Sequence, residues 1–342
     1  MPAESISVAR SDPREVERWI AEYIRGSDNP DLRQYGGALL RQAQAAVAGR
    51  YLWFMQYLMR LGGMYDARVL DVGCGFGWQA LAISMLGANH VIANDIRESM
   101  TLPVQERIEA VRRLGAKVSV ETLTGDICTA DLPAGSFDAI VCNQTIEHVH
   151  DLDSMFRVCF HVLKPRGRCV IANDNNVLNR KRLKTLQKIW KERDRSQAYI
   201  DRLKKERPIE NRHIKPYAVM REEIARQSNP LLSDEDVAAI VAATAGLLEP
   251  EIGRIAETYC AATELPTLPE HKWCRNPVTG EYCERQLDPF SAKRLMESCG
   301  FQTKLVHSFR RFPLNLLNRI PFRPLNLWLF NLRGAFVIVG RK

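Results

Sequence analysis

The sequence predicts an α/β fold in which a mostly parallel sheet is interrupted by a large helical insertion. Between Arg68 and Asp174, short β-branched runs alternate with amphipathic helical stretches, the pattern of parallel strands joined by helical crossovers. The pattern resumes near the C-terminus, where Asp288 and Pro289 start a helix that two strand-like runs follow. We therefore expect one α/β domain over residues 67–174 and 287–342, a helical insertion over 175–286 and an N-terminal helical segment over 1–66.

Composition and charge bound the class of protein. The chain has 342 residues, 46% hydrophobic and 26% charged, which fits a globular protein with a sizeable core. It has no run of about 18 apolar residues, and its N-terminus lacks the basic-then-apolar order of a secretory signal, so we expect a cytoplasmic protein. The nine cysteines form no CxxC pair and several lie in apolar runs, which predicts reduced, mostly buried thiols.

The N-terminal segment reads as helices. Asp12, Pro13 and Glu15 form a helix start, and apolar residues then recur on one face until Gly26. A second helical run covers residues 38–61 and carries a crowd of aromatic side chains, for which core packing is favoured over a substrate pocket: Tyr51, Trp53, Phe54 and Tyr57.

Three glycines follow the first predicted strand at alternate positions, in VLDVGCGFGW. Gly73, Gly75 and Gly77 lie where an open parallel sheet binds a nucleotide-like ligand, and glycine lets the backbone approach that ligand. NAD is disfavoured, because Trp78 occupies the third glycine position of the GxGxxG fingerprint. Asp95, at the end of the second strand, is placed to accept both hydroxyls of a ribose.

Five motifs in order, VLDVGCGFG, ANDI, GDI, FDAIVCNQTIEHVHD and VLKPRG, resemble those of class I S-adenosylmethionine-dependent methyltransferases, in particular the small-molecule, type 11-like group. The resemblance covers Arg68–Asp174 and, more loosely, Glu284–Lys342. It implies a Rossmann-like sheet of seven strands whose last strand, Ala335–Arg341, runs antiparallel, and S-adenosylmethionine as the cofactor. Two positions depart from the pattern: the usual LKPGG reads LKPRG, and Asn94 stands where an apolar residue is commoner.

The resemblance also implies a set of cofactor-binding residues at the carboxyl edge of the sheet: Asp71, Gly73, Gly75 and Gly77 along the methionine part, Asp95 at the ribose with Ile96 beside it, Asp126 and Ile127 at the adenine, and Asn143 and Gln144 at the sulfonium end. Asp126 would accept from the adenine amino group, and Ile127 would donate its backbone N–H. Arg50 is a candidate for binding the cofactor's carboxylate, because it lies upstream of the first strand.

The chemistry of methyl transfer needs a base only for some acceptors. A sulfonium methyl is already electrophilic, so the enzyme needs no metal; it must align the nucleophile, exclude water and deprotonate a hydroxyl acceptor. We expect His148 to be that base, with Glu147 orienting or stabilising it and His150 a poorer choice. Alternatively, Glu147 and His148 cap and pack the next helix, and proximity alone suffices for an amine acceptor.

The insertion occupies the position of an acceptor-binding lid. Its candidate substrate residues are the aromatic and polar side chains that such a lid needs: Tyr199, His213, Tyr217, Tyr259, Trp273, Tyr282 and Arg285. Residues 180–207 carry net charge +8 and residues 231–270 carry −7, so these segments pair with each other or present solvated faces. A zinc site at His271, Cys274 and Cys283 with Cys260 lacks a paired short spacing, so structural thiols are favoured.

The connector between the last two predicted strands is unusually apolar. Residues 310–333 carry prolines, a Trp-Phe cluster and several arginines, which favours packing against the sheet edge or a second subunit, as in a homodimer. A peripheral membrane or lipid contact is the alternative interpretation of this segment.

The leading hypothesis is a methyltransferase acting on a hydroxyl or amine of a small molecule, such as a sugar, a glycan precursor or a secondary metabolite. RNA methylation is an alternative motivated by the basic run RKRLKTLQKIWKERDR, but the acidic half of the insertion nearly cancels that charge and no NPPY-like tetrapeptide follows the fourth strand, so nucleic acid is disfavoured. Two further alternatives are ring closure of the cofactor itself, releasing methylthioadenosine, and an inactive cofactor-binding partner protein. The sequence does not identify the acceptor or the modified atom.

Overall fold

The computed structural model describes residues 11–42, 48–259, 265, 274–308, 316 and 335–342. The chain forms two compact units. The sheet unit comprises Met1–Ile146, Asp151–Leu178 and Asp288–Lys342, and the insertion unit comprises Glu147–His150 and Asn179–Leu287. The N-terminal helices thus belong to the sheet unit.

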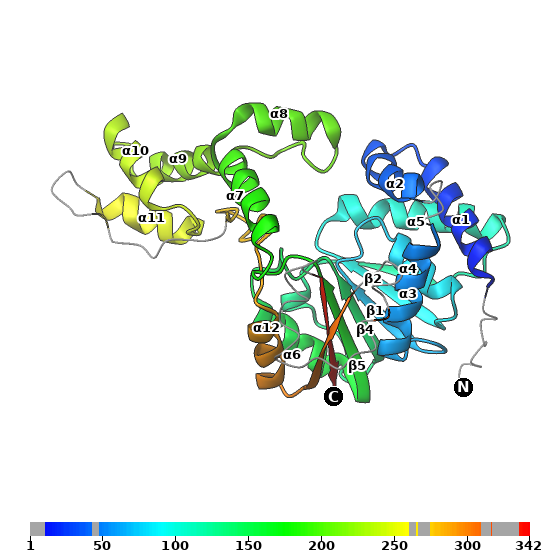
Figure 1. Ribbon diagram of the computed structural model, residues 1–342. Coiled ribbons are helices and arrows are strands. Elements are labelled where there is room, and N and C mark those ends of the chain that lie inside the picture. Colours follow the sequence, from blue (N-terminus) through cyan, green and yellow to red (C-terminus); the bar gives the residue numbers. More distant parts are fainter. Residues whose placement is uncertain (1–10, 43–47, 260–264, 266–273, 309–315, 317–334) are drawn as a thin grey trace. The chain divides into compact units, whose positions relative to one another are not determined.

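The sheet unit is built on seven strands in the order β3-β2-β1-β4-β5-β7-β6 (Figure 1). Their bounds are β1 Arg68–Val72, β2 His90–Asp95, β3 Val120–Thr124, β4 Phe137–Asn143, β5 Leu163–Asn173, β6 Gln302–His307 and β7 Phe336–Arg341. Strands β1 to β5 run parallel, whereas β7 runs antiparallel to both β5 and β6. The predicted seven-stranded, mostly parallel sheet with an antiparallel last strand is confirmed.

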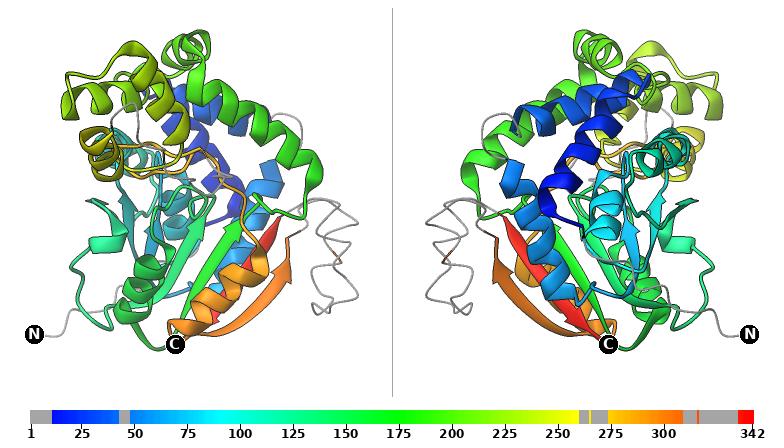
Figure 2. Two further views of the ribbon diagram at one scale, coloured as in Figure 1. Left: turned by 90° about the vertical axis from the view of Figure 1, so that its left-hand side faces the viewer. Right: turned by 90° about the vertical axis from the view of Figure 1, so that its right-hand side faces the viewer.

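Helices cover both faces of this sheet (Figure 2). The helices of the unit are α1 Pro13–Arg25, α2 Pro30–Gln42, α3 Ala48–Gly62, α4 Trp78–Met85, α5 Glu98–Arg113, α6 Leu152–Val162 and α12 Pro289–Ser298, with a short 3-10 turn at Ile127–Thr129. Helices α3, α4 and α5 pack on one face, and α6 and α12 pack on the other. Since β1 and β4 are central, their carboxyl ends mark the place where an open sheet of this kind binds ligands.

The predicted N-terminal helix is confirmed. Asp12 caps α1 by accepting from the Arg14 N–H, and the buried Tyr23 hydroxyl donates to the Phe76 carbonyl at 2.7 Å, which ties α1 to the glycine-rich loop. The run predicted over 38–61 falls into α2 and α3, with residues 43–47 outside the described part. Core packing is confirmed for Trp53, Phe54 and Tyr57; the side chain of Tyr51 is outside the described residues.

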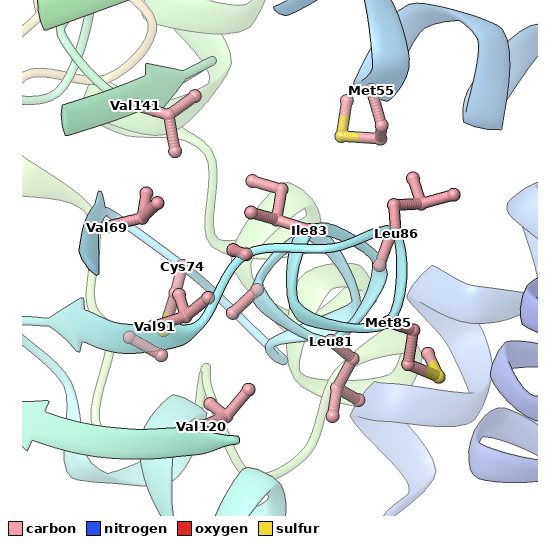
Figure 3. Close-up of a cluster of buried hydrophobic side chains, with 14 of the residues drawn as sticks. Met55, Val69, Cys74, Leu81, Ile83, Met85, Leu86, Val91, Val120 and Val141 are labelled. Carbon is pink, nitrogen blue, oxygen red and sulfur yellow. The ribbon is translucent and has the colours of Figure 1, made fainter. Parts of the chain in front are cut away.

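The core between α3, α4 and the sheet is a continuous apolar layer. Figure 3 shows the side chains that fill it, from two helices and four neighbouring strands: Met55, Leu81, Ile83, Met85, Leu86, Val69, Val91, Val120 and Val141. Burying each large side chain of this kind stabilises the fold by about 1.5–3 kcal/mol. The layer thereby holds the β1 to α4 connection, on which the glycines lie, in one conformation.

The insertion unit consists of α7 Arg180–Arg195, α8 Gln197–Glu206, α9 Tyr217–Ser228, α10 Asp234–Ala243, α11 Glu249–Thr258 and an antiparallel bridge between Arg275 and Tyr282. Ser233 and Asp236 form the predicted capping box of α10. Arg221, 1% exposed, donates to both carboxylate oxygens of Asp194 at 2.7 and 3.2 Å and so links α9 to α7. The lysines along α7 are exposed, as in a solvated face: Lys181, Lys184, Lys188 and Lys191.

Several predictions about single residues can be compared with the structure. Six of the cysteines are buried, as expected, whereas Cys274 and Cys283 are half-buried. Arg166, which replaces the usual glycine, adopts a left-handed φ of 67°. Apart from Leu316, the connector 310–333 and its predicted contacts lie outside the described residues. No helix among the described residues is both long and apolar enough to cross a membrane.

We expect Gly77→Ala to destabilise the sheet unit strongly. Gly77 has φ 73°, and a Cβ there would lie 2.5 Å from Val104 Cγ2 of α5. The left-handed backbone and the overpacking together should lower the free energy of unfolding by about 2–4 kcal/mol. The matched control is Gly115→Ala, with φ 89° and, in the described part of the chain, no atom within 4 Å of the added Cβ, for which about 1 kcal/mol is expected. Equal losses in urea unfolding would contradict the packing role of Gly77.

Candidate functional site

The glycine-rich loop between β1 and α4 has the left-handed backbone that its sequence requires. Gly73, Gly75 and Gly77 have φ values of 70°, 52° and 73°. A Cβ on Gly73 would collide with Thr145, which donates from its hydroxyl to the Val72 carbonyl at 3.3 Å. A Cβ on Gly75 would meet no atom of the described residues within 4 Å. The loop is therefore packed tightly against its own chain at Gly73 and Gly77, and it is open at Gly75.

Three polar side chains form a hydrogen-bonded chain at the carboxyl ends of β1 and β4 and the start of α4, and Asp71 and Gln79 of this chain are buried. Asn143 Nδ2 donates to Gln79 Oε1 at 3.0 Å, and Gln79 Nε2 donates to Asp71 Oδ1 at 2.6 Å. Asp71 Oδ2 and Asn143 Oδ1 are buried and have no hydrogen-bond partner in the described part of the chain. Because buried acceptors are nearly always satisfied, two orphaned oxygens point to a ligand that donates hydrogen bonds.

Asp95 ends β2 with its carboxylate turned towards the glycine loop. Its Oδ2 accepts from the Gly75 N–H at 2.9 Å, and its Oδ1 accepts from the Arg97 N–H at 3.1 Å. Each carboxylate oxygen can accept a further hydrogen bond. The neighbouring Asn94, which departs from the family pattern, is 2% exposed and donates to the carbonyls of Leu123 and Gly125, so it joins β2 to the end of β3.

The remaining predicted cofactor residues lie at the ends of the strands. Asp126 caps the 3-10 turn by accepting from the Cys128 N–H, and Ile127 is buried. Ile96 follows β2 directly and is 55% exposed. Gln144 follows β4 with a left-handed φ of 57°, and its amide exchanges two hydrogen bonds with Asp174 when its nitrogen is oriented to the Asp174 carboxylate.

A second group of candidate residues belongs to the insertion unit and centres on His148. Its Nδ1 lies 2.9 Å from the Tyr282 carbonyl, which can only accept, so the Nδ1–H donates and, in the neutral imidazole, Nε2 carries the lone pair. Nε2 lies 3.8 Å from Glu284 Oε1, and Glu284 Oε2 in turn accepts from Arg182 at 3.2 Å. Glu284 has a left-handed φ of 57°, a conformation that non-glycine residues hold mainly at constrained sites.

The surroundings of His148 favour its charged form. Burial by itself lowers the pKa of the imidazole, but the carboxylates of Glu147, Glu284 and Glu281 and the hydrogen bond to Tyr282 outweigh burial and raise it above its usual value. Glu147 is 2% exposed, and its backbone carbonyl accepts from the Arg285 N–H at 3.3 Å. The alternative prediction that Glu147 and His148 cap the next helix is wrong, because Asp151 caps α6.

Glu147, His148 and Glu284 have ligand atoms within 4.8 Å of one another, a spacing that a divalent cation could bridge. Arginine charges already oppose these carboxylates. Arg182 forms an ion pair with Glu284. Burial lowers the pKa of Arg285, and the nearby Glu147 carboxylate opposes this shift. These arginines partly neutralise the negative charge that would hold a cation at this position.

The predicted substrate residues separate into two groups. Tyr282 and Arg285 lie beside His148: the Tyr282 ring has Arg285 at 4.2 Å, and Arg285 Nη2 donates to the Val149 carbonyl at 2.7 Å. The other described residues contact different parts of the insertion unit or solvent: Tyr217 is buried under Arg193, Tyr259 packs near α9 and α11, Tyr199 stacks with Arg202, and His213 is exposed. Trp273 and the side chain of Arg50 are outside the described residues.

Sequence analysis did not identify three residues that lie beside the predicted ones: Gln79, Thr145 and Glu284. Gln79 carries a usable signal, since it is the only amide in the mostly apolar helix WQALAISM. Thr145 follows β4 directly after the predicted pair Asn143 and Gln144. Glu284 has no local signal, because it meets His148 only through the folding of the insertion.

The fold and the sheet-edge residues define the class of this domain. A glycine-rich loop after β1, an acidic residue ending β2 and a seventh strand antiparallel to the fifth are the arrangement expected for a class I S-adenosylmethionine-dependent methyltransferase domain. Residues 70–171 match the family described as methyltransferase domain. The chain therefore contains a methyltransferase domain, and the predicted family resemblance and cofactor class are confirmed over these residues.

Known proteins resemble this chain over part of their length. A ubiquinone biosynthesis O-methyltransferase of Xylella fastidiosa is 35% identical over 128 residues, 36% of this chain and 48% of that protein. Phosphoethanolamine N-methyltransferase 1 of Arabidopsis thaliana is 35% identical over 106 residues, 31% of this chain and 21% of that protein. The chain thus matches about half or less of these curated relatives.

Solved structures resemble the chain at lower identity. An S-adenosylmethionine-dependent methyltransferase from Mesorhizobium loti has a TM-score of 0.43 and 13% identity, covering 84% of this chain and 96% of that one. A SAM-dependent methyltransferase from Aquifex aeolicus has a TM-score of 0.41 and 14% identity, covering 97% and 99%.

The residues present fit S-adenosylmethionine. The orphaned Asp71 Oδ2 and Asn143 Oδ1 are acceptors suited to the donors of the amino group, and Asp95 has acceptor capacity for ribose hydroxyls. Ile96 offers an exposed apolar side chain at the same edge. The bound cofactor would supply an electrophilic methyl group, and these protein residues would bind and orient it.

We expect Asp71 to make the stability of the ligand-free protein fall as pH rises. Burial raises its pKa to about 7, with Asp95 adding to the shift and the Gln79 hydrogen bond opposing it. The folded state therefore keeps a proton that the unfolded state releases above pH of about 4, so Asp71 should cost about 1.4 kcal/mol per pH unit until roughly pH 7. Asp71→Asn should remove this slope in urea unfolding from pH 4 to 8. Identical slopes for both proteins would contradict the raised pKa.

Proposed function

We propose that this protein transfers a methyl group from S-adenosylmethionine to a hydroxyl or amine of a small molecule, with His148 as the base for a hydroxyl acceptor. The observation that carries the proposal is the fixed tautomer of His148. The Tyr282 carbonyl holds the Nδ1–H, so Nε2 is the nitrogen that can accept a proton. A base with a raised pKa is a stronger proton acceptor near neutral pH.

The carboxylates around His148 support the same role. When Nε2 takes a proton, the imidazolium forms beside Glu284 at 3.8 Å and near the buried Glu147, both of which stabilise its charge. In the sequence, Glu147 and His148 follow shortly after Asn143, the last residue of β4. The proton leaves the acceptor as the methyl group arrives, and no metal is needed to make the sulfonium reactive.

The names of the relatives support a small-molecule acceptor. One relative is named for ubiquinone biosynthesis and another for phosphoethanolamine methylation, and both names indicate small acceptors, one methylated on oxygen and one on nitrogen. The base geometry at His148 favours oxygen. Tyr282 and Arg285, which lie beside His148, are the proposed acceptor contacts.

A product assay tests this proposal. The purified chain is incubated with S-adenosylmethionine carrying a labelled methyl group, together with a panel of catechols, phenols, sugars and amines, and with bulk tRNA in parallel. Label in a small acceptor with S-adenosylhomocysteine as the co-product supports the proposal. Label in tRNA, or methylthioadenosine formed with no acceptor, contradicts it in favour of RNA methylation or ring closure of the cofactor.

A further inference from the structure

Two cysteines face each other across the hairpin that carries the partners of His148. The antiparallel bridge pairs Arg275 with Tyr282, so Cys274 and Cys283 are the next opposite pair, and the Cys283 N–H donates to the Cys274 carbonyl at 2.8 Å. In such a pair the Cα atoms lie about 5.5 Å apart, which is within the range that a disulfide spans. Both thiols are free and half-buried, whereas the other described cysteines are buried.

The two thiols are chemically unequal. The interaction between the two neighbouring sulfurs lowers the pKa of Cys283 and raises that of Cys274. Burial opposes this shift at Cys283, while the nearby Arg193 guanidinium and His148 favour the thiolate. Arg193 Nη1 is buried and has no hydrogen-bond acceptor in the described part of the chain.

We propose that Cys283 and Cys274 form a reversible disulfide, in which Cys283 reacts first with a peroxide and Cys274 resolves the product. The Cys283 thiol loses its proton to solvent, the thiolate attacks one oxygen of hydrogen peroxide, and the O–O bond breaks. A sulfenic acid forms, and the departing hydroxide takes a proton from solvent and leaves as water. The Cys274 sulfur then attacks the Cys283 sulfur, loses its proton and expels a second water. One peroxide is thereby reduced and two thiols are oxidised, and an added dithiol reverses the step by exchange.

The location of this pair links oxidation to the His148 group. The residues that flank Cys283 are Tyr282, whose carbonyl holds the His148 Nδ1–H, and Glu284, which faces Nε2. The Cys283 carbonyl also accepts from Trp190 Nε1 at 2.6 Å, which anchors this strand to α7. A disulfide would fix the strand carrying Tyr282 and Glu284 to its partner strand. Formation of the disulfide itself does not require the proposed methyl transfer.

Peptide mapping of the full chain tests the inference without an activity readout. After treatment with hydrogen peroxide and alkylation of remaining thiols, we expect a peptide pair linked through Cys274 and Cys283 that dithiothreitol separates. Cys274→Ser should instead accumulate a Cys283 sulfenic acid that dimedone traps, and Cys283→Ser should abolish both products. Cys299→Ser, a buried cysteine of the sheet unit, is the matched control and should leave the linked pair unchanged.

The role of Arg193 is tested separately by the rate of Cys283 alkylation with iodoacetamide at pH 7. Arg193→Gln should slow it about tenfold, since thiolate reactivity follows the thiolate fraction, while Arg193→Lys keeps the charge and should retain most of the rate. The inference is overturned if both thiols stay alkylatable at peroxide doses that oxidise other cysteines. It is also overturned if wild-type Cys283 accumulates as sulfenic acid without a linked pair.

Discussion

Asp95→Ala should weaken binding of S-adenosylmethionine by at least about 10²-fold while leaving the protein folded. The substitution removes the carboxylate that would accept hydrogen bonds from two ribose hydroxyls. Hydrogen bonds to charged groups contribute about 1.5–3 kcal/mol each. It would also lose its hydrogen bond from the Gly75 N–H at 2.9 Å, which orients the open part of the glycine loop. Isothermal titration calorimetry with each purified variant measures the change.

Two variants separate the parts of this effect. Asp95→Asn keeps the size of the side chain and one acceptor oxygen, so its loss should fall between those of the wild type and Asp95→Ala. Asp131→Ala removes an exposed carboxylate and should bind as the wild type does. If Asp95→Ala binds the cofactor normally and unfolds at the same urea concentration, the ribose assignment is wrong.

The sheet and its cofactor edge could be predicted from sequence because their signals are local. Asp71, the three glycines and Asp95 stand at strand ends that the β-branched runs mark, and parallel topology brings these ends to one edge of the sheet. The structure explains an exception, Asn94, as a side chain that bonds the carbonyls at the end of β3. Gln79 could also have been predicted from local sequence, because it is an amide in a mostly apolar helix.

The surroundings of His148 could not be predicted in the same way. Its position after β4 could be found locally, but its partners Tyr282 and Glu284 come from the far end of the insertion. Charge patterning also did not predict that the buried Arg221 pairs with the half-buried Asp194 of the basic segment. Non-local pairs of this kind depend on how helices and a hairpin pack, and no periodicity in the sequence encodes them.

His148→Gln should lower kcat for a hydroxyl acceptor by about 10²–10⁴-fold, with little change in the affinity for the cofactor. The wild-type rate should rise with pH as His148 loses its proton, around a pKa above the usual histidine value because the nearby carboxylates outweigh burial. Glu284→Gln removes one of these carboxylates, so the rising limb should move to lower pH. His161→Gln, an exposed histidine of α6, is the matched control and should leave the profile unchanged.

The pH profile distinguishes a base from the other roles that the geometry allows. If His148 only packs the hairpin, Glu284→Gln should change the rate without moving the limb, and this outcome would contradict the base role. If Glu147, His148 and Glu284 instead hold a divalent cation, chelation with EDTA should abolish the wild-type rate and added metal should restore it. An amine acceptor gives a third pattern, because a neutral amine attacks without a base and His148→Gln would then cost little. The base role therefore requires both the shifted limb in Glu284→Gln and a rate that persists in EDTA.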